Sequence, residues 1–128
     1  MENPMSDSVL KHFKWKEIEL EHLNPLFDRQ MVVGESIMLA RIILKKGAYV
    51  PMHHHFNEQL TYCLEGGMKF GIDGREIELR PGDGLCIPPN MPHEAWALED
   101  TIELDVFVPP RADWLAKDDA YLRGKGTR

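Results

Sequence analysis

The chain has 128 residues, a formal net charge of −6, 43% apolar residues and 28% charged residues. This length allows one domain around a single core, and the composition is that of an ordinary globular protein. The negative charge, without basic clusters among aromatic residues, argues against nucleic acid or an anionic membrane as a partner. No stretch approaches the ~20 apolar residues that span a bilayer, and Met1–Ser8 shows no secretory signal, so we expect a cytoplasmic protein.

Short apolar runs separated by Gly, Pro and Asp recur along the chain, which indicates an all-β sandwich or barrel. The expected strands are Lys14–Leu20, Met31–Glu35, Ile37–Lys45, Leu60–Leu64, Met68–Ile72, Arg75–Leu79, Gly84–Ile87, His93–Ala97 and Thr101–Val108. We expect residues 1–12 to form a flexible N-terminal segment and residues 13–128 to form the single domain. After Pro109 and Pro110 the pattern changes, which predicts a short helix or irregular tail. Its apolar members are expected to dock on the barrel: Trp114, Leu115, Tyr121 and Leu122.

Two local features refine this picture. Asp73 and Gly74 lie between two strand-like runs and predict a type I′ hairpin turn, because both central residues of that turn need positive φ. Asn90 follows two prolines and suits a left-handed conformation. Cys63 and Cys86 are expected to be buried free thiols, because the cytosol keeps thiols reduced.

The strongest chemical signal is the run His53, His54 and His55, with His93 further along the chain. Imidazole is the commonest side-chain ligand for divalent transition metals. Three consecutive histidines also occur in exposed loops and expression tags, but a tag normally lies at a terminus and this run is internal. The pattern therefore favours a buried metal centre, with His54 as a spacer.

Spacing suggests the other ligands, because residues two apart on an extended strand share a face. If the segment stays extended, His53 and His55 share their face with Gln59, which is then the nearer fourth donor. A bulge in the strand would present Glu58 instead, so this choice stays open.

The two patches resemble the motifs of the cupin superfamily. The first motif is matched by Gly47, His53, His55, Gln59 and Gly66. The second is matched by Gly82, Pro88 and His93, with Asn90 and Ala97 in place of the usual Gly and Asn. The resemblance implies a small cupin jelly-roll β-barrel that holds one divalent metal through His53, His55, Gln59 and His93. Zinc, nickel, iron, manganese, cobalt or copper would suit such ligands.

The glutamine replaces the glutamate of most cupins. Three neutral imidazoles and a neutral amide leave the double charge of the ion unbalanced by protein, which strengthens its pull on a substrate oxygen. This composition favours Lewis-acid chemistry over oxygen activation.

Residues 98–100 and 104–115 resemble a narrower group, the pectin-degradation cupins of the KdgF type. These convert 4,5-unsaturated uronates, released by polysaccharide lyases, into linear keto sugars. The resemblance implies that Asp105, Phe107 and Arg111 join the metal ligands in the pocket. Arg111 would bind a sugar carboxylate through its planar guanidinium group.

The orientation of Asp105 has two interpretations. Asp105 and Phe107 share one face of their strand, whereas Ile102, Leu104, Val106 and Val108 share the other. If the apolar residues fill the barrel, Asp105 points to solvent. The family likeness favours the inward orientation.

The sequence therefore predicts a metal-dependent cupin enzyme of the lyase, hydratase or isomerase type. We expect its substrate to be a small anionic sugar acid of uronate metabolism, that is, of the breakdown of pectin or alginate. We also expect a homodimer that pairs through sheet faces such as Ser36–Leu44. The alternatives are a cupin dioxygenase, a polyketide-type cyclase, or a non-catalytic metabolite-binding cupin.

Overall fold

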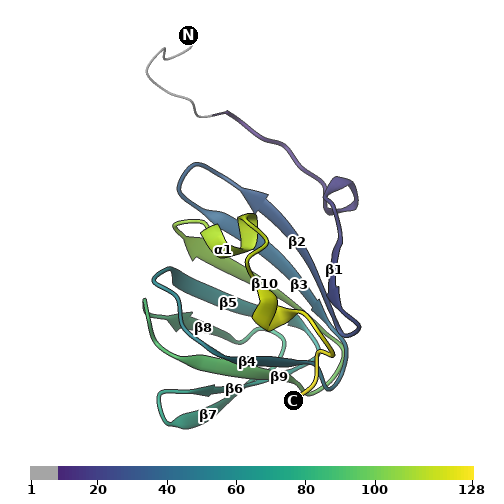
Figure 1. The fold of residues 1–128 in the computed structure, drawn as a ribbon, viewed down its shortest axis with the longest axis vertical. Helices are drawn as coiled ribbons and strands as arrows, with labels where there is room; N and C mark the ends of the chain where they lie inside the picture. Colours follow the sequence, from purple (N-terminus) through teal and green to yellow (C-terminus); the bar gives the residue numbers. More distant parts are fainter. Residues whose placement is uncertain (1–8) are drawn as a thin grey trace.

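The computed structural model describes residues 9–128, and most of its regular structure is β-strand (Figure 1). The strands are β1 (Glu21–Asn24), β2 (Phe27–Val33), β3 (Met38–Leu44), β4 (Tyr49–His53), β5 (Glu58–Glu65), β6 (Met68–Ile72), β7 (Arg75–Leu79), β8 (Gly84–Ile87), β9 (His93–Ala97) and β10 (Thr101–Val108). The helical elements are α1 (Ala112–Leu115) and the 3-10 turns η1 (Trp15–Glu17) and η2 (Ala120–Leu122).

Two antiparallel sheets enclose the core. The larger has the strand order β1-β2-β3-β10-β5-β8, and the smaller has the order β4-β9-β6-β7. In Figure 1 the two sheets lie against each other with the yellow C-terminal segment, which carries α1 and η2, in front of them. The predicted all-β jelly-roll barrel is confirmed.

The two halves of the barrel interior differ in polarity. Strand β3 alternates strictly between buried and half-buried residues, and its inward side chains are Met38, Ala40, Ile42 and Leu44. The neighbouring strands β10 and β5 turn polar side chains inward, including Gln59, Thr61, Glu103 and Asp105. One wall of the interior is therefore apolar and stabilising, while the other carries groups capable of chemistry.

The apolar side chains of β10 face outward. Ile102, Leu104 and Val106 are half-buried on the outer face of the larger sheet, so the interpretation in which they fill the barrel is wrong. Leu60 and Tyr62 are exposed beside them on β5. The homodimer predicted to pair through sheet faces such as Ser36–Leu44 stays a prediction.

Five predicted strands, β6 to β10, match the structure residue for residue. The predicted strand Lys14–Leu20 is wrong: the chain forms η1 there, and β1 follows it. Strand β2 begins earlier than the predicted Met31–Glu35, because the polar side chains of Arg29 and Gln30 are buried and obscured the strand pattern. Strand β4 was not predicted. Its proline, Pro51, is compatible with a strand because β4 is at the edge of its sheet.

The turn predictions are confirmed, and one thiol prediction is wrong. Asp73 and Gly74 have φ values of 52° and 71°, as a type I′ turn requires, and Asn90 has a φ of 63°. Cys63 is buried as expected, but Cys86 is exposed because it lies opposite Leu60 on the outer face.

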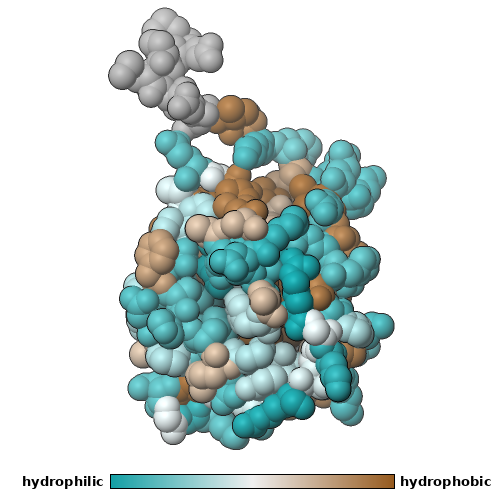
Figure 2. Space-filling view, viewed as in Figure 1, coloured by the Kyte–Doolittle hydropathy of each residue, from teal (hydrophilic) through white to brown (hydrophobic). Residues whose placement is uncertain are grey.

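The predicted flexible segment, residues 1–12, falls largely on residues 1–8, which lie outside the described residues, so the proposed domain boundary stays a prediction. Within residues 9–128, no helix has the length and apolar character needed to cross a membrane. The face in Figure 2 is largely hydrophilic around the C-terminal segment, and its largest apolar areas lie toward the N-terminal end.

A buried ion pair holds the C-terminal segment on the barrel. Nη2 of Arg29 lies 2.8 Å from Oδ2 of Asp119, and both side chains are fully buried. The same nitrogen bonds Glu21 at 2.7 Å, and the Arg29 guanidinium group stacks on Trp114. Trp114 and Leu122 pack against the core as predicted, whereas Leu115 is exposed.

We predict that Asp119→Ala destabilises the protein by about 3 kcal/mol, because it leaves the buried Arg29 charge with only part of its compensation. Asp118→Ala is the matched control, since Asp118 is the exposed neighbour, and it should change stability by less than about 0.5 kcal/mol. Chemical denaturation measures both. Equal free energies of unfolding for the two variants would show that the ion pair does not anchor the segment.

Candidate metal centre

Three histidines converge at one end of the barrel. His53 ends β4 and is paired in register with His93 at the start of β9, while His55 lies in the link between β4 and β5, just before a bend at residues 56–57. One ligand atom from each ring lies within 4.8 Å of the others. His54, between two of them, is exposed. The predicted histidines therefore meet, although a bend between two sheets brings them together rather than one extended strand.

Backbone hydrogen bonds fix the tautomer of each ring. The Nδ1 atoms of His53, His55 and His93 lie 2.7, 3.0 and 2.8 Å from the carbonyl oxygens of Pro51, Asn57 and Met91. A carbonyl oxygen only accepts hydrogen bonds, so in the neutral ring each Nδ1 carries the hydrogen and each Nε2 keeps a lone pair. Partners of this kind orient metal-binding imidazoles.

Burial keeps these rings neutral. It lowers the pKa of His53 to about 3, with a further contribution from His93. Burial and the charge of Arg111 lower the pKa of His55 to about 4, and burial also lowers the pKa of His93. Neutral imidazole is the form that binds a metal, so near neutral pH no proton competes strongly for these lone pairs.

Gln59 offers a fourth donor. Its side chain is buried, and its Oε1 lies 3.0 Å from Nε2 of His55. Because Nδ1 of His55 carries the ring hydrogen, two lone pairs face each other across this distance, and a cation between them would turn the repulsion into attraction. Glu58 is exposed on the opposite side of the strand, so Gln59 is the residue placed beside the cluster. This set of donors fits a divalent metal ion.

Asp105 and Phe107 both point into the barrel. Asp105 is 4% exposed and accepts a hydrogen bond of 2.7 Å from Oγ1 of Thr61. Burial raises its pKa to about 6, against the lowering effect of Thr61 and Arg111. The Phe107 ring stands edge-on to the His55 ring at 5.6 Å. Of the two interpretations of Asp105, the inward one is observed.

Arg111 is held rigidly at the edge of the same cavity. Its side chain is 2% exposed, and its Nε and Nη2 atoms donate to the carboxylate of Asp113 at 2.9 and 2.8 Å. The guanidinium carbon lies 5.1 and 4.5 Å from the ring centres of Phe107 and Trp114. Its Nη1 atom is buried and has no hydrogen-bond partner among the described residues. Nε and Nη1 of Arg29 are also buried without hydrogen-bond partners in the described part of the chain, but Arg29 lies outside the cavity. Arg111 lines the cavity, so an oxygen-bearing ligand there would satisfy its Nη1.

The sequence interpretation missed four residues of this site. Thr61 and Glu103 lie on the inward faces of β5 and β10, and burial together with Asp105 raises the pKa of Glu103 well above its ordinary range. Each lies two residues from a predicted site residue, Thr61 from Gln59 and Glu103 from Asp105, and therefore shares its strand face. This spacing was the signal in the sequence that could have identified them. Trp114 and Tyr121 were expected only to dock on the barrel. Both line the cavity, and the hydroxyl of Tyr121 accepts hydrogen bonds from Arg111 and Trp114.

The cavity that these residues enclose is small, about 30 Å³, close to the space that one water molecule needs. Tyr121 and Leu122 close it on the side of the C-terminal segment, where the Tyr121 ring lies 4.9 Å from the His53 ring. Any organic ligand therefore requires these side chains to move.

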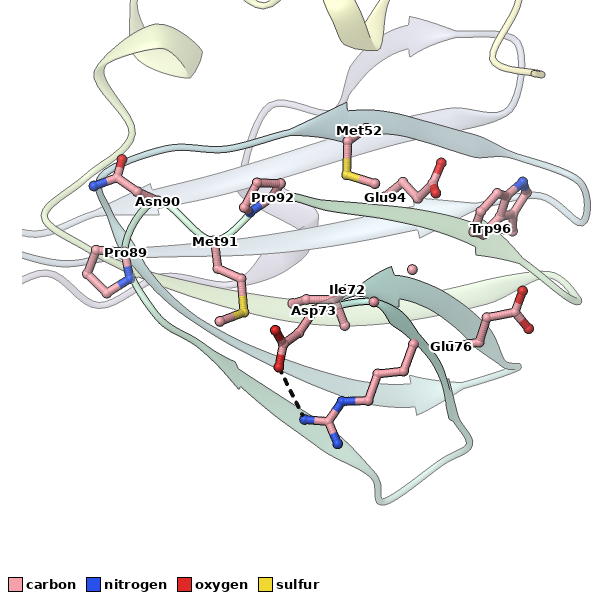
Figure 3. Close-up of a pocket in the computed structure, with 13 residues that line it drawn as sticks. Met52, Ile72, Asp73, Glu76, Pro89, Asn90, Met91, Pro92, Glu94 and Trp96 are labelled. Carbon is pink, nitrogen blue, oxygen red and sulfur yellow. Dashed lines mark ion pairs between the residues drawn. The ribbon is translucent and has the colours of Figure 1, made fainter.

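A larger groove of about 850 Å³ lies on the outer face of the smaller sheet (Figure 3). Met52, Glu94 and Trp96 point into it from β4 and β9, and Met91 and Pro92 form one edge. None of its lining residues is a histidine, and the Glu94 carboxylate accepts a hydrogen bond from Tyr49. The groups able to hold a metal lie inside the barrel, on the other side of β9.

Comparisons with known proteins show what the chain is similar to. A protein-family model described as a cupin domain matches residues 40–108. Over 60 residues, 47% of this chain and 18% of the relative, the sequence is 38% identical to quercetin 2,3-dioxygenase of Bacillus subtilis (strain 168). The chain spans between 18% and 50% of the length of the curated relatives it matches.

Two solved structures are similar over most of both chains. An RmlC-like cupin from Shewanella frigidimarina NCIMB 400 has a TM-score of 0.78 and 28% identity, with 85% of this chain and 99% of that one covered. KdgF from Halomonas sp. has a TM-score of 0.78 and 27% identity, with 83% and 99% covered. Since the family model also spans more than half of the sequence, the chain belongs to the cupin family.

Proposed function

We propose that the protein is a metal-dependent enzyme that converts a 4,5-unsaturated uronate into a linear keto sugar. The observation that carries the proposal is the buried, unpartnered Nη1 of Arg111, a cationic donor at the edge of the cavity that His53, His93 and Gln59 line. A carboxylate is its natural partner because it neutralises the charge and accepts the hydrogen bond. The structural similarity to KdgF of Halomonas sp. supports the same assignment.

His53, His55, His93 and Gln59 would hold the metal ion. When bound, a divalent cation would supply Lewis-acid polarisation of a substrate oxygen and stabilise negative charge that develops there. Imidazole nitrogen and amide oxygen suit zinc, nickel, iron, manganese, cobalt or copper.

The remaining residues would bind the substrate and move its protons. Arg111 would hold the carboxylate through Nη1, and Phe107 would shape the pocket beside it. Asp105 would hold and release a proton at its carboxyl group during the addition of water and the opening of the ring. A general acid or base contributes typically ~10²–10⁴-fold, most effectively when its pKa is near the working pH. The raised pKa of Asp105, about 6, suits this role.

Substrate entry requires a conformational change. A uronate is much larger than the cavity of about 30 Å³, so Tyr121 and the segment that carries it would have to move away from His53. The hydrogen bonds from Arg111 and Trp114 to the Tyr121 hydroxyl would then break, which would also free one N–H of Nη2 of Arg111 for the ligand, while the other stays bonded to Asp113.

The metal assignment predicts that His93→Ala lowers the affinity for a divalent ion by at least about 100-fold, because one of three converging lone pairs is lost. His54→Ala is the matched control. It removes the exposed histidine of the same run and should leave one ion bound per chain. Titration of tag-free protein with cobalt(II) against a competing chelator measures both variants. Equal affinities for the two variants would contradict the assignment.

The reaction is tested with an unsaturated monouronate, whose conjugated chromophore absorbs in the ultraviolet and is lost on conversion. Metal-loaded protein should accelerate its loss over the spontaneous rate, and Asp105→Ala, measured at saturating metal, should lower kcat by about 10²–10⁴-fold. Glu94→Ala removes a carboxylate from the outer groove and is the control. An unaccelerated reaction with metal-loaded protein would exclude this substrate class.

A second candidate is a dioxygenase, which the sequence similarity to quercetin 2,3-dioxygenase supports. Oxygen consumption by iron-loaded protein with an organic substrate would favour it. In a non-catalytic metabolite-binding cupin, by contrast, Asp105→Ala would leave ligand binding intact and there would be no turnover to lose.

A further inference from the structure

Thr61 lies between Gln59 and Asp105 in the polar wall of the barrel. Its side chain is 2% exposed, and its backbone is paired directly with that of Asp105 across β5 and β10. Nε2 of Gln59 donates to Oγ1 of Thr61 at 2.7 Å, and Oγ1 of Thr61 donates to Oδ1 of Asp105 at 2.7 Å. Three side chains thus form one buried hydrogen-bond chain, and its Gln59 end lies beside Nε2 of His55.

The direction of these hydrogen bonds decides which end of the Gln59 amide faces the histidines. A hydroxyl group has one hydrogen, and here it is donated to the carboxyl oxygen of Asp105. The lone pairs of Thr61 therefore need a donor on the other side, and the NH₂ group of Gln59 supplies it. The amide oxygen is then left to face Nε2 of His55, at 3.0 Å.

We propose that Thr61 is a positioning residue for the metal centre: held by Asp105, it turns the Gln59 amide so that its oxygen, and not its nitrogen, faces the metal ion. An amide nitrogen carries two hydrogens and offers no lone pair to a cation, so the reversed amide would repel it. A glutamate at this position has two equivalent oxygens and needs no such control. The inference rests on the metal part of the proposed function and is independent of the uronate reaction.

The test compares the cobalt(II) affinity of Thr61→Val and Thr61→Ser with that of the wild type. Valine keeps the shape but removes the hydroxyl, and we expect affinity to fall by about 10–100-fold, the usual cost of losing an outer partner of a metal ligand. Serine keeps the hydroxyl and should restore affinity to within about threefold of the wild type. If the valine variant does not fold, Thr61→Ala takes its place.

Thr101→Val is the matched control for the loss of a buried hydroxyl. Thr101 is 1% exposed on the inward face of β10, but its hydroxyl bonds the backbone of Gly67 and Glu99, away from the histidines. It should lower thermal stability without changing cobalt affinity. The visible absorption spectrum of bound cobalt, which reports its ligands, should change in Thr61→Val and stay unchanged in Thr101→Val.

A double-mutant cycle isolates the route through Gln59. In a Gln59→Ala background the amide is absent, so Thr61→Val should cause no further loss of affinity. An equal loss in both backgrounds, or wild-type affinity and spectrum in Thr61→Val, would overturn the inference while leaving the metal centre intact. A wild-type protein that binds no cobalt would overturn both the inference and the metal part of the proposed function.

Discussion

Three hydrogen bonds from imidazole Nδ1 atoms to backbone carbonyls are the interaction on which the site depends. Each carbonyl belongs to a residue two positions away from its histidine, so the local backbone orients each ring without help from distant side chains. Burial removes the competing protonated form. What remains is a group of Nε2 lone pairs that converge on a small space and gain most from a cation.

The barrel supplies that space at a cost in stability. The inward faces of β5 and β10 carry polar groups where an apolar wall would pack better, and burying a polar atom without a partner costs about 1–3 kcal/mol. Among the described residues, the buried side-chain atoms without a hydrogen-bond partner are Nη1 of Arg111, Oε2 of Glu103, Nε and Nη1 of Arg29, and Oδ2 of Asp119. The apolar side chains of β3 and the buried Arg29–Asp119 pair lie outside this polar wall and hold the barrel and its C-terminal segment together. A polar inner wall that lowers stability in this way is typical of a functional site.

Local sequence signals predicted much of the fold. The strands from Met68 to Val108 alternate clearly and are separated by Gly, Pro or Asp turns, and their bounds are correct. The first half of the chain was harder, because β2 buries polar Arg29 and Gln30, and β4 contains Pro51. In both places tertiary context, a buried ion pair or an edge position, overrides the intrinsic preference of the residues.

The candidate site, like the fold, could be predicted from the sequence only in part. The histidine spacing and the family motifs indicated the residues that converge in the structure. Periodicity alone left the orientation of Asp105 open, because the other face of β10 is apolar and could equally have filled the barrel. The structure settles it: Asp105 is paired with Ala40 and Thr61, and all three are buried on the inward face of the sheet. The closure of the cavity by Tyr121 was beyond local reasoning, since its position depends on how an irregular segment docks across the barrel.

The metal centre is tested most directly by X-ray absorption spectroscopy at the metal edge of tag-free, metal-loaded protein. Multiple scattering from imidazole rings gives the number of histidine ligands. The distances from the metal to its ligand atoms distinguish nitrogen and oxygen from sulfur. We predict three imidazole ligands together with oxygen donors. A centre with fewer than three imidazoles, or with a sulfur ligand, would contradict it.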